Sequence, residues 1–231
     1  MKRKPMGEKM LYVIGDLHGD LNRLKEPAIK RLTKRDTLIV LGDFGFLWAG
    51  DEREKRNLKW LSQRKFNLLF IEGTKDNYDL LREYPVQEFA GGRCRHIGGN
   101  VRQLMRGEIF TIEDMKLFCF GGGESQDKAE RTEGVNWWRS EMPTADELDN
   151  AEENLAKNKW QVDYILTHEP SAKLSLFIDQ ERIETNRLGR FFDELAEKVT
   201  YKTWYCGCFH RDMAIGTKAA VVYRTPVQLK V

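Results

Sequence analysis

The chain has 231 residues, of which 41% are hydrophobic and 32% charged, and this composition excludes collagen-like, low-complexity and strongly disordered classes. Its 38 lysine and arginine residues nearly balance 36 aspartate and glutamate residues, so the formal net charge of +2 gives no overall electrostatic reason to expect nucleic acid or a membrane surface as a partner. No stretch approaches the roughly 20 apolar residues that a membrane-spanning helix needs.

The N-terminal segment and the cysteines predict a cytoplasmic protein. A basic start precedes a short apolar run, residues 11–14, which is too short for the core of a signal peptide. Four cysteines in a chain of this length do not make the pattern of a secreted disulfide framework. We therefore expect a reduced compartment, a polar N-terminal tail over residues 1–9 and a single domain over residues 10–231.

Short apolar runs alternate with charged amphipathic segments in the first third of the chain. The runs at 10–15, 37–43 and 66–73 end at a glycine beside an acidic residue, which is typical of strands buried on both faces. Residues 21–34 and 51–65 lie between these runs and predict helices, the first with a kink or break at Pro27. This alternation of strands and helices predicts a parallel sheet within an α/β fold.

The rest of the chain predicts a hairpin, two helices and further strands. Residues 94–106 and 108–121 predict strands and a hairpin with its turn near Glu113 and Asp114. The long loop at 121–143 contains Trp137 and Trp138, and we expect at least one of them to anchor the loop to the body of the protein. The remaining predicted elements are a capped helix at 144–160, a buried strand at 162–170, a helix at 183–199, and strands at 202–207, 218–224 and 227–231.

Residues of the kinds that bind transition metals follow several of the predicted strands. They are Asp16, His18, Asp43, His168, Cys208 and His210. Because the carboxyl ends of parallel strands meet at one edge of a sheet, we expect these side chains to gather there. Carboxylate and imidazole ligands together favour Mn, Fe or Zn, and such a cation could turn water into a nucleophile at neutral pH.

Four short motifs in this order resemble those of the calcineurin-like metallophosphoesterase family. They are GDLHG at 15–19, GDFG at 42–45, THEP at 167–170 and GCFH at 207–210. The resemblance implies a two-layered β-sandwich flanked by helices, with a two-metal centre at the carboxyl ends of the strands. It also implies that Asp16, His18 and His210 hold one metal, while Asp43 bridges to a second metal near His168.

Two motifs depart from the pattern that the resemblance implies. Residues 73–76 read Gly-Thr-Lys-Asp, so Thr74 replaces an asparagine ligand of the second metal and Lys75 replaces the histidine acid next to the leaving group. Cys208 replaces a histidine in the last motif. Three interpretations stay open: the Cys208 thiolate helps to bind Zn or Fe, the Lys75 ammonium takes the place of the second cation, or catalysis is lost and the pocket only binds a ligand.

These observations predict a metal-dependent phosphoesterase that acts on a phosphorylated small molecule or nucleotide, with reduced or redirected activity. We expect one Mn, Fe or Zn site and leave a second open. The candidate catalytic residues are Lys75, Asp76 and Arg131, of which Arg131 lies on the long loop and could clamp a phosphate oxygen. The alternative is a catalytically inactive protein of the same fold that binds a ligand or a protein partner in a regulatory role.

Overall fold

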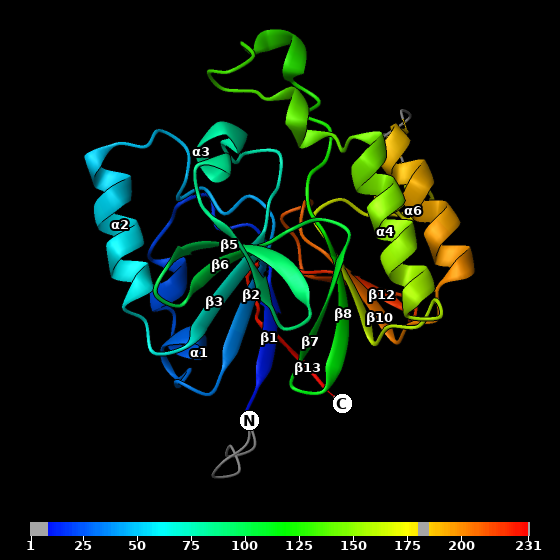
Figure 1. The fold of residues 1–231 in the computed structure, drawn as a ribbon, viewed down its shortest axis with the longest axis horizontal. Helices are drawn as coiled ribbons and strands as arrows, with labels where there is room; N and C mark the ends of the chain where they lie inside the picture. The colour runs from blue at the N-terminus through cyan, green and yellow to red at the C-terminus, as the bar shows by residue number, and fades with distance from the viewer. Residues whose placement is uncertain (1–8, 180–184, 231) are drawn as a thin grey trace.

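Two β-sheets face each other in the computed structural model, which describes residues 9–179 and 185–230 (Figure 1). The first sheet contains β1 (Leu11–Ile14), β2 (Thr37–Leu41), β3 (Asn67–Ile71), β4 (Val86–Phe89), β5 (Gly92–Gly98), β6 (Val101–Leu104) and β13 (Val227–Leu229). The second contains β7 (Glu108–Ile112), β8 (Met115–Phe120), β9 (Tyr164–Thr167), β10 (Thr203–Cys206), β11 (Met213–Ile215) and β12 (Ala219–Val221). Their spatial orders are β13-β1-β2-β3-β6-β5-β4 and β11-β12-β10-β9-β8-β7.

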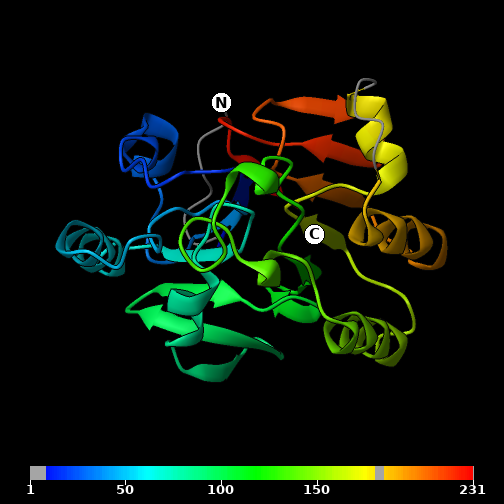
Figure 2. The same cartoon turned by 90° about the horizontal axis from the view of Figure 1, so that it is seen from above.

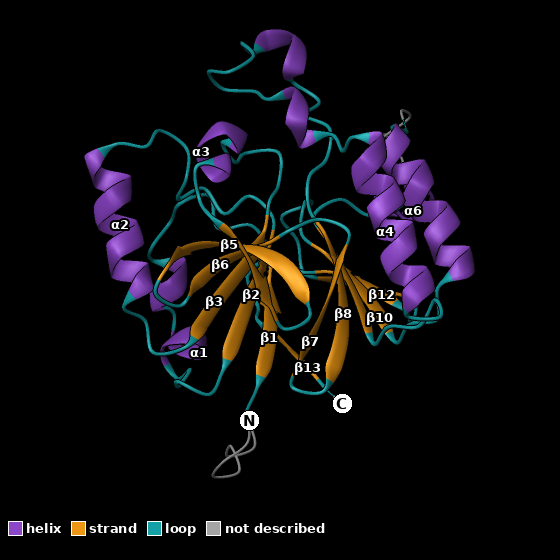
Figure 3. Cartoon of the chain, viewed as in Figure 1, coloured by secondary structure: helices purple, strands orange, loops and turns teal. Residues whose placement is uncertain are grey.

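Helices cover the outer faces of both sheets (Figure 3). They are α1 (Pro27–Lys30), α2 (Glu52–Ser62), α3 (Tyr78–Arg82), α4 (Ala145–Lys157), α5 (Ala172–Ile178) and α6 (Arg187–Lys198), with short 3₁₀ turns at Arg23–Lys25, Lys128–Glu130 and Arg139–Glu141. The helices α1 and α2 lie outside the first sheet, whereas α4 and α6 lie outside the second. The predicted sandwich flanked by helices is therefore confirmed.

Alternate residues of each central strand enter different layers of the core. Val13 and Ile39 of the first sheet pack with Leu166 of the second between the sheets. Their neighbours Ile14 and Val40 point outward and pack beneath the helices on that side. Because both faces of these strands are buried, their sequences read as continuous apolar runs rather than as alternating patterns.

Parallel pairing brings the ends of several strands to one edge of the sandwich. In the first sheet β2 pairs in parallel with β1 and β3, and in the second β9 pairs in parallel with β8 and β10. The carboxyl ends of these strands lie at the top of Figure 1, and the segment 121–143 lies above them, as Figure 2 shows from above. Trp138 is buried there and donates a hydrogen bond to Asp79 (2.8 Å), so the expected anchoring of the loop by a tryptophan is confirmed.

The helix boundaries confirm some predictions and correct others. Thr144 and Glu147 form the predicted capping box of α4. The predicted break at Pro27 is confirmed, because a 3₁₀ turn precedes α1, in which Pro27 occupies the first turn, where its missing N–H is not needed; helix covers less of 21–34 than predicted. The helix α6 begins at Arg187 because the Asn186 side chain caps it, while residues 183 and 184 of the predicted helix lie outside the described residues.

Four short elements were not predicted, namely β4, α3, α5 and β11. The strand β4 is mostly exposed and pairs with β5 through a tight turn in which Ala90 and Gly91 have positive φ. The predicted hairpin turn at Glu113 and Asp114 is confirmed, and both residues have left-handed backbone conformations (φ 50° and 61°). The predicted tail falls almost entirely on residues 1–8, which lie outside the described residues. None of the helices in residues 9–179 and 185–230 has the length and apolar character to cross a bilayer.

Candidate metal centre

The candidate ligands lie on tight turns that follow the strand ends. His18, Asp43 and His210 all have left-handed backbone conformations (φ 48°, 43° and 48°). The turns after β1 and β2 are joined, because the backbone N–H groups of Leu17 and His18 donate to the carbonyl oxygen of Asp43 at 3.1 and 2.9 Å. Non-glycine residues rarely adopt this conformation, and such strain gathers at functional sites.

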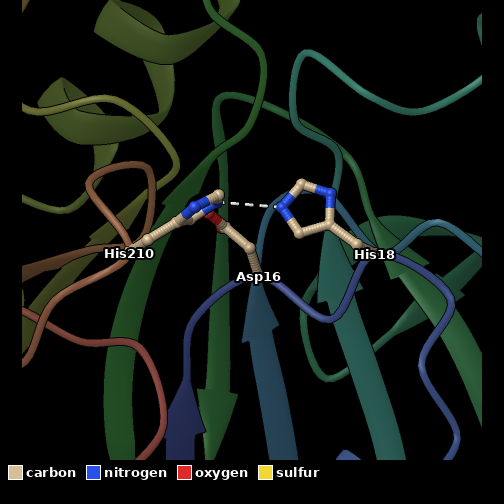
Figure 4. Close-up of side chains that lie close together, drawn as sticks. All are labelled: Asp16, His18 and His210. Carbon is tan, nitrogen blue, oxygen red and sulfur yellow. Dashed lines mark hydrogen bonds and ion pairs between the residues drawn. The ribbon is translucent and has the colours of Figure 1, made fainter.

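Asp16, His18 and His210 bring their polar atoms together at the centre of the site (Figure 4). The Nε2 atoms of His18 and His210 lie 2.9 Å apart, and Nε2 of His210 lies 3.1 Å from Oδ2 of Asp16. One ligand atom from each residue lies within 4.8 Å of the others. No other group of three or more His, Cys, Asp or Glu side chains in the described residues comes together this closely. A single cation could replace the proton shared by the two imidazoles.

The Asp16 carboxylate is an unusual buried group. Its side chain is fully buried, and its oxygens lie 3.4 Å from Nδ1 of His168 and 3.1 Å from Nε2 of His210 without a hydrogen bond of good geometry. Burial acts to raise the pKa of Asp16, but the neighbouring His168 and His210 outweigh it and lower that pKa, so the group is held ionised. A buried carboxylate that has only imidazole partners is costly unless those imidazoles or a bound cation carry a compensating positive charge. Two imidazole nitrogens beside such a carboxylate therefore fit a divalent transition cation.

The two exposed histidines of the group have opposite pKa shifts. Burial lowers the pKa of His18, which keeps its imidazole neutral near pH 7. The Asp16 carboxylate beside His210 raises the pKa of that imidazole above its usual value. An imidazole binds a metal through a deprotonated nitrogen, so a cation would compete with a proton for Nε2 of His210.

Asp43 and His168 stand next to this group. Nε2 of His168 lies 3.6 Å from Oδ1 of Asp43, and Nδ1 lies 3.4 Å from Oδ1 of Asp16. Burial acts to lower the pKa of His168, but the carboxylates of Asp43 and Asp16 outweigh it and raise that pKa to about 10. Nδ1 also lies 3.1 Å from the carbonyl oxygen of Leu41, so a proton on Nδ1 leaves Nε2 facing Asp43.

Two glycines give the ligands room. A Cβ atom on Gly42 would lie 2.0 Å from Nδ1 of His168, and one on Gly73 would lie 2.2 Å from Oδ1 of Asp43. Gly42 also has a positive φ of 96°. Any larger residue at either position would displace a candidate ligand.

An aromatic and cationic stack supports His210 from behind. The His210 ring stacks on Tyr223 with 4.9 Å between centroids, and the Arg23 guanidinium lies 4.6 Å from the centroid of the same tyrosine. Arg23 donates to the carbonyl oxygens of Asp16 (2.8 Å) and Tyr223 (2.5 Å). Arg23 thus ties the turn after β1 to the C-terminal segment that orients His210.

The altered residues Thr74, Lys75 and Cys208 line one pocket of about 420 Å³ together with His18, Asp43, His168 and His210. The backbone N–H of Lys75 donates to Oδ1 of Asp43 (2.7 Å), and its ammonium donates to Asp127 (3.3 Å). Arg131 does not line this pocket, because its guanidinium donates to Asp127 (2.7 Å) and to the carbonyl oxygen of Asn136 (2.8 Å). The Lys75 ammonium and the Arg131 guanidinium therefore both bind the Asp127 carboxylate, which also lines the pocket.

Asp76 lies behind the pocket rather than on its surface. Its carboxylate is buried and accepts hydrogen bonds from the backbone N–H groups of Phe44, Gly45 and Gly73 (2.9–3.2 Å). Burial and the Asp43 charge raise the pKa of Asp76 to about 7. These bonds give Asp76 a clear task in fixing the loops after β2 and β3, and its predicted catalytic role stays a prediction.

A buried polar network lies under the loop that carries Lys75. The hydroxyl of Tyr78 donates to the carbonyl oxygen of Gly73 (2.9 Å) and accepts from Arg106 (3.2 Å). Arg106 also pairs with Glu72 at 2.7 Å, and both side chains are less than 5% exposed. This network fixes the position of the Gly73 loop from the side opposite the pocket.

A family model described as calcineurin-like phosphoesterase matches residues 10–207. This chain belongs to the calcineurin-like phosphoesterase family. A search of curated proteins found no match. Membership of this phosphoesterase family implies dependence on a divalent metal, and the geometry offers one site for it at Asp16, His18 and His210. The matched range ends before Cys208 and His210, so the structure itself brings His210 to the other two residues.

Several residues of the site were not predicted from the sequence. Glu169 directly follows His168 in the THEP motif, which could have drawn attention to it, and it lines the pocket with Glu124. Arg23, Tyr223 and the network around Tyr78 carry no local signal, because they reach the site only through contacts between distant segments.

Proposed function

We propose that this chain hydrolyses a phosphate ester or phosphodiester of a small molecule or nucleotide, with a transition metal as cofactor, in the cytoplasm. Its four cysteines are free, which agrees with a reduced compartment. The observation that carries the proposal is Asp16, a fully buried carboxylate whose partners are the imidazoles of His168 and His210, beside the His18 and His210 nitrogens that face each other at 2.9 Å. Such an arrangement makes sense as a cation site in a chain of this family.

We assign Asp16, His18 and His210 as the ligands of one cation, with Asp43 and His168 beside it as ligands of a second, weaker one that Cys208 supports. A cation bound there lowers the pKa of water and offsets the negative charge of phosphate oxygens. Mn, Fe and Zn all suit carboxylate and imidazole ligands, and a thiolate from Cys208 would shift the preference toward Zn or Fe.

The charge of the pocket supports the proposal that substrate binding depends on a bound cation. Lys75 is the one lysine or arginine among the described residues that line it. The carboxylates that line the same pocket are Asp43, Glu124, Asp127, Glu169 and Asp179. A phosphate dianion would be repelled by this excess of carboxylates until bound cations reverse the local charge.

Lys75 supplies fixed positive charge on the side of the pocket where the family motif has its acid. Its backbone bond to Asp43 places it next to the candidate ligands, and Asp127 holds its ammonium at 3.3 Å. We assign Lys75 to stabilise charge near the leaving group. Arg131 is a positioning residue in this scheme, since it holds Asp127 at 2.7 Å and does not face the substrate.

The test combines metal analysis of the purified protein with hydrolysis of a bis-aryl phosphate and an aryl monophosphate under Mn, Fe, Co and Zn. We expect turnover with at least one metal and its loss in Asp43→Ala. The matched control is Asp149→Ala, which removes an exposed carboxylate from α4 and should leave turnover unchanged.

The competing function is a binding or regulatory protein that has lost catalysis, and Thr74, Lys75 and Cys208 at altered motif positions favour it. Absence of turnover with every metal, together with turnover gained in the triple variant Thr74→Asn, Lys75→His, Cys208→His, would overturn the phosphoesterase proposal and identify a retired active site.

A further inference from the structure

A second cavity lies at the end of the second sheet opposite the metal centre. Its volume is about 610 Å³, and it is formed by the end of α4, the starts of β8 and β9 and the segment before β10. Asp163 and His168 flank the two ends of β9, so the cavity and the metal pocket lie at opposite ends of the same strand. In Figure 1 these segments meet at the lower ends of β8, β10 and α4.

The cavity has a strongly positive lining. Lys116, Lys157, Lys159 and Lys202 line it, against the single carboxylate of Asp163. Lys218 also has its ammonium over the ring of Tyr201 (5.6 Å), whereas the ammonium of Lys198, over the ring of Trp160 (5.6 Å), pairs with Glu152 at 3.2 Å. This concentration of charge contrasts with the near neutrality of the whole chain, whose formal net charge is +2.

Two of these lysines are not neutralised by a carboxylate. Lys116 donates its ammonium hydrogen bond to the neutral amide oxygen of Asn158 (2.8 Å). Lys159 has no ion pair within residues 9–179 and 185–230, whereas Lys202 pairs with Asp163 at 2.9 Å. The pair of Lys157 with Glu153 is exposed on both sides and at 3.4 Å holds neither side chain firmly.

The helix dipole explains the position of only one of the four lysines that line the cavity. Lysines near the carboxyl end of a helix balance its dipole, and this explains Lys157 in the last turn of α4. Lys116 and Lys202 lie at strand starts, outside any helix. Lys159 follows α4 in a left-handed conformation, as does Trp160 (φ 56° for both), so the chain adopts a strained turn that leaves the Lys159 side chain exposed.

We propose that this cavity binds an oligophosphate, an anion with two or more linked phosphate groups such as the triphosphate chain of a nucleotide, through Lys116, Lys159 and Lys202. The volume lies within the range of small-molecule sites. Separate lysine ammonium groups suit several linked phosphates, since each acts as a compact point charge. The side chains of Asn158, Gln161 and Thr200 add hydrogen-bonding groups to the lining.

Equilibrium dialysis with radiolabelled inorganic triphosphate tests the proposal on the metal-loaded protein, with ATP and a single-stranded oligonucleotide in parallel. We expect saturable binding of triphosphate and a loss of affinity of about tenfold or more in Lys116→Ala/Lys159→Ala. The matched control is Lys55→Ala/Lys173→Ala, which removes two positive charges from α2 and α5 and should change affinity less than about twofold. Comparison of ATP with triphosphate shows whether a nucleoside adds to the binding, and either result supports the site.

The variant His210→Ala distinguishes this cavity from the metal pocket, because the variant should still bind triphosphate if the proposal holds. Lys159→Asn provides a second variant that retains the fold, since asparagine accepts the left-handed conformation better than most residues, and it should weaken binding about threefold. Equal loss in the control variant, loss in His210→Ala, no saturable binding, or tighter binding of the oligonucleotide than of triphosphate would each overturn the proposal.

Discussion

The two sides of the metal pocket differ in how closely they keep the pattern of the family. On the first side, Asp16, His18 and His210 match their motifs and lie within ligand distance of one another. On the second side Asp43 and His168 match the motifs, whereas Thr74, Lys75 and Cys208 stand where the resemblance predicts other residues. The left-handed backbone conformations occur at His18, Asp43 and His210, and not at the replaced residues.

This difference teaches that the costly features of the site belong to its unchanged residues. Strained turns, a buried carboxylate paired only with imidazoles and close glycine contacts all lie at or next to Asp16, Asp43 and the histidines. A fold keeps such features where they serve a ligand. Thr74, Lys75 and Cys208 line the pocket without a left-handed backbone conformation.

Substitutions at His210 and at Cys208 should differ most in their effect on bound metal and turnover. We expect His210→Ala to lose bound metal and to reduce turnover about 10³-fold, because a bound cation contributes several kcal/mol to transition-state stabilisation. Cys208→Ala should reduce turnover about tenfold at most, since it supports only the weaker second site. Metal content by mass spectrometry and steady-state kinetics of both variants check this, and equal losses in the two would contradict the comparison.

The second prediction concerns a variant that introduces the motif residues expected on the second side of the pocket. In the triple variant Thr74→Asn, Lys75→His, Cys208→His, we expect the metal content to rise from one equivalent toward two and turnover to increase about 10²-fold, the typical contribution of a general acid. Lys75→His alone is the control, since it supplies the acid without the second site. A triple variant that folds but binds no additional metal would show that the second side no longer encodes a cation site.

The third prediction concerns the pH dependence of metal binding. The pKa of His210 is raised by Asp16, and that of His168 is raised to about 10 by Asp43 and Asp16, so the metal-free protein holds the His168 proton near neutral pH and the His210 proton to a higher pH than a free imidazole would. Metal must displace these protons, and its affinity should therefore increase with pH between 6 and 8, by about tenfold per pH unit for each proton released. Titrations at three pH values measure the slope, and a flat profile would contradict the assignment.

The fourth prediction concerns the contribution of the Tyr78 hydrogen bonds to the stability of the protein. Tyr78→Phe leaves the Gly73 carbonyl and an Arg106 donor without their partner, so the free energy of unfolding should fall by about 1–2 kcal/mol and the melting temperature by a few degrees. The control is Tyr12→Phe, whose hydroxyl forms no hydrogen bond within the described residues and which should cost less than about 0.5 kcal/mol. Equal melting temperatures for the two variants would contradict this role of Tyr78.

Much of the fold could be predicted because its central strands have strong local signals. The runs around Val13, Ile39 and Leu69 are continuous in apolar residues, and they form β1, β2 and β3 between two layers of core. The exposed strand β4 and the short helices have weaker patterns, because little of their surface is buried. The break of the segment 21–34 could be predicted from Pro27, whereas the short length of α1, which ends at Lys30, could not be predicted from periodicity.

The order of candidate metal ligands after particular strands could be predicted from the sequence alone, because turn glycines and apolar runs are local properties of the chain. Only the tertiary structure decided that His18 and His210, 192 residues apart, face each other at 2.9 Å. It also decided that Asp76 accepts three backbone hydrogen bonds, that Arg131 meets Lys75 at Asp127, and that Arg23 connects Asp16 to Tyr223. The physical reason is that these contacts depend on the pairing of whole strands and the packing of two sheets, which no single segment encodes.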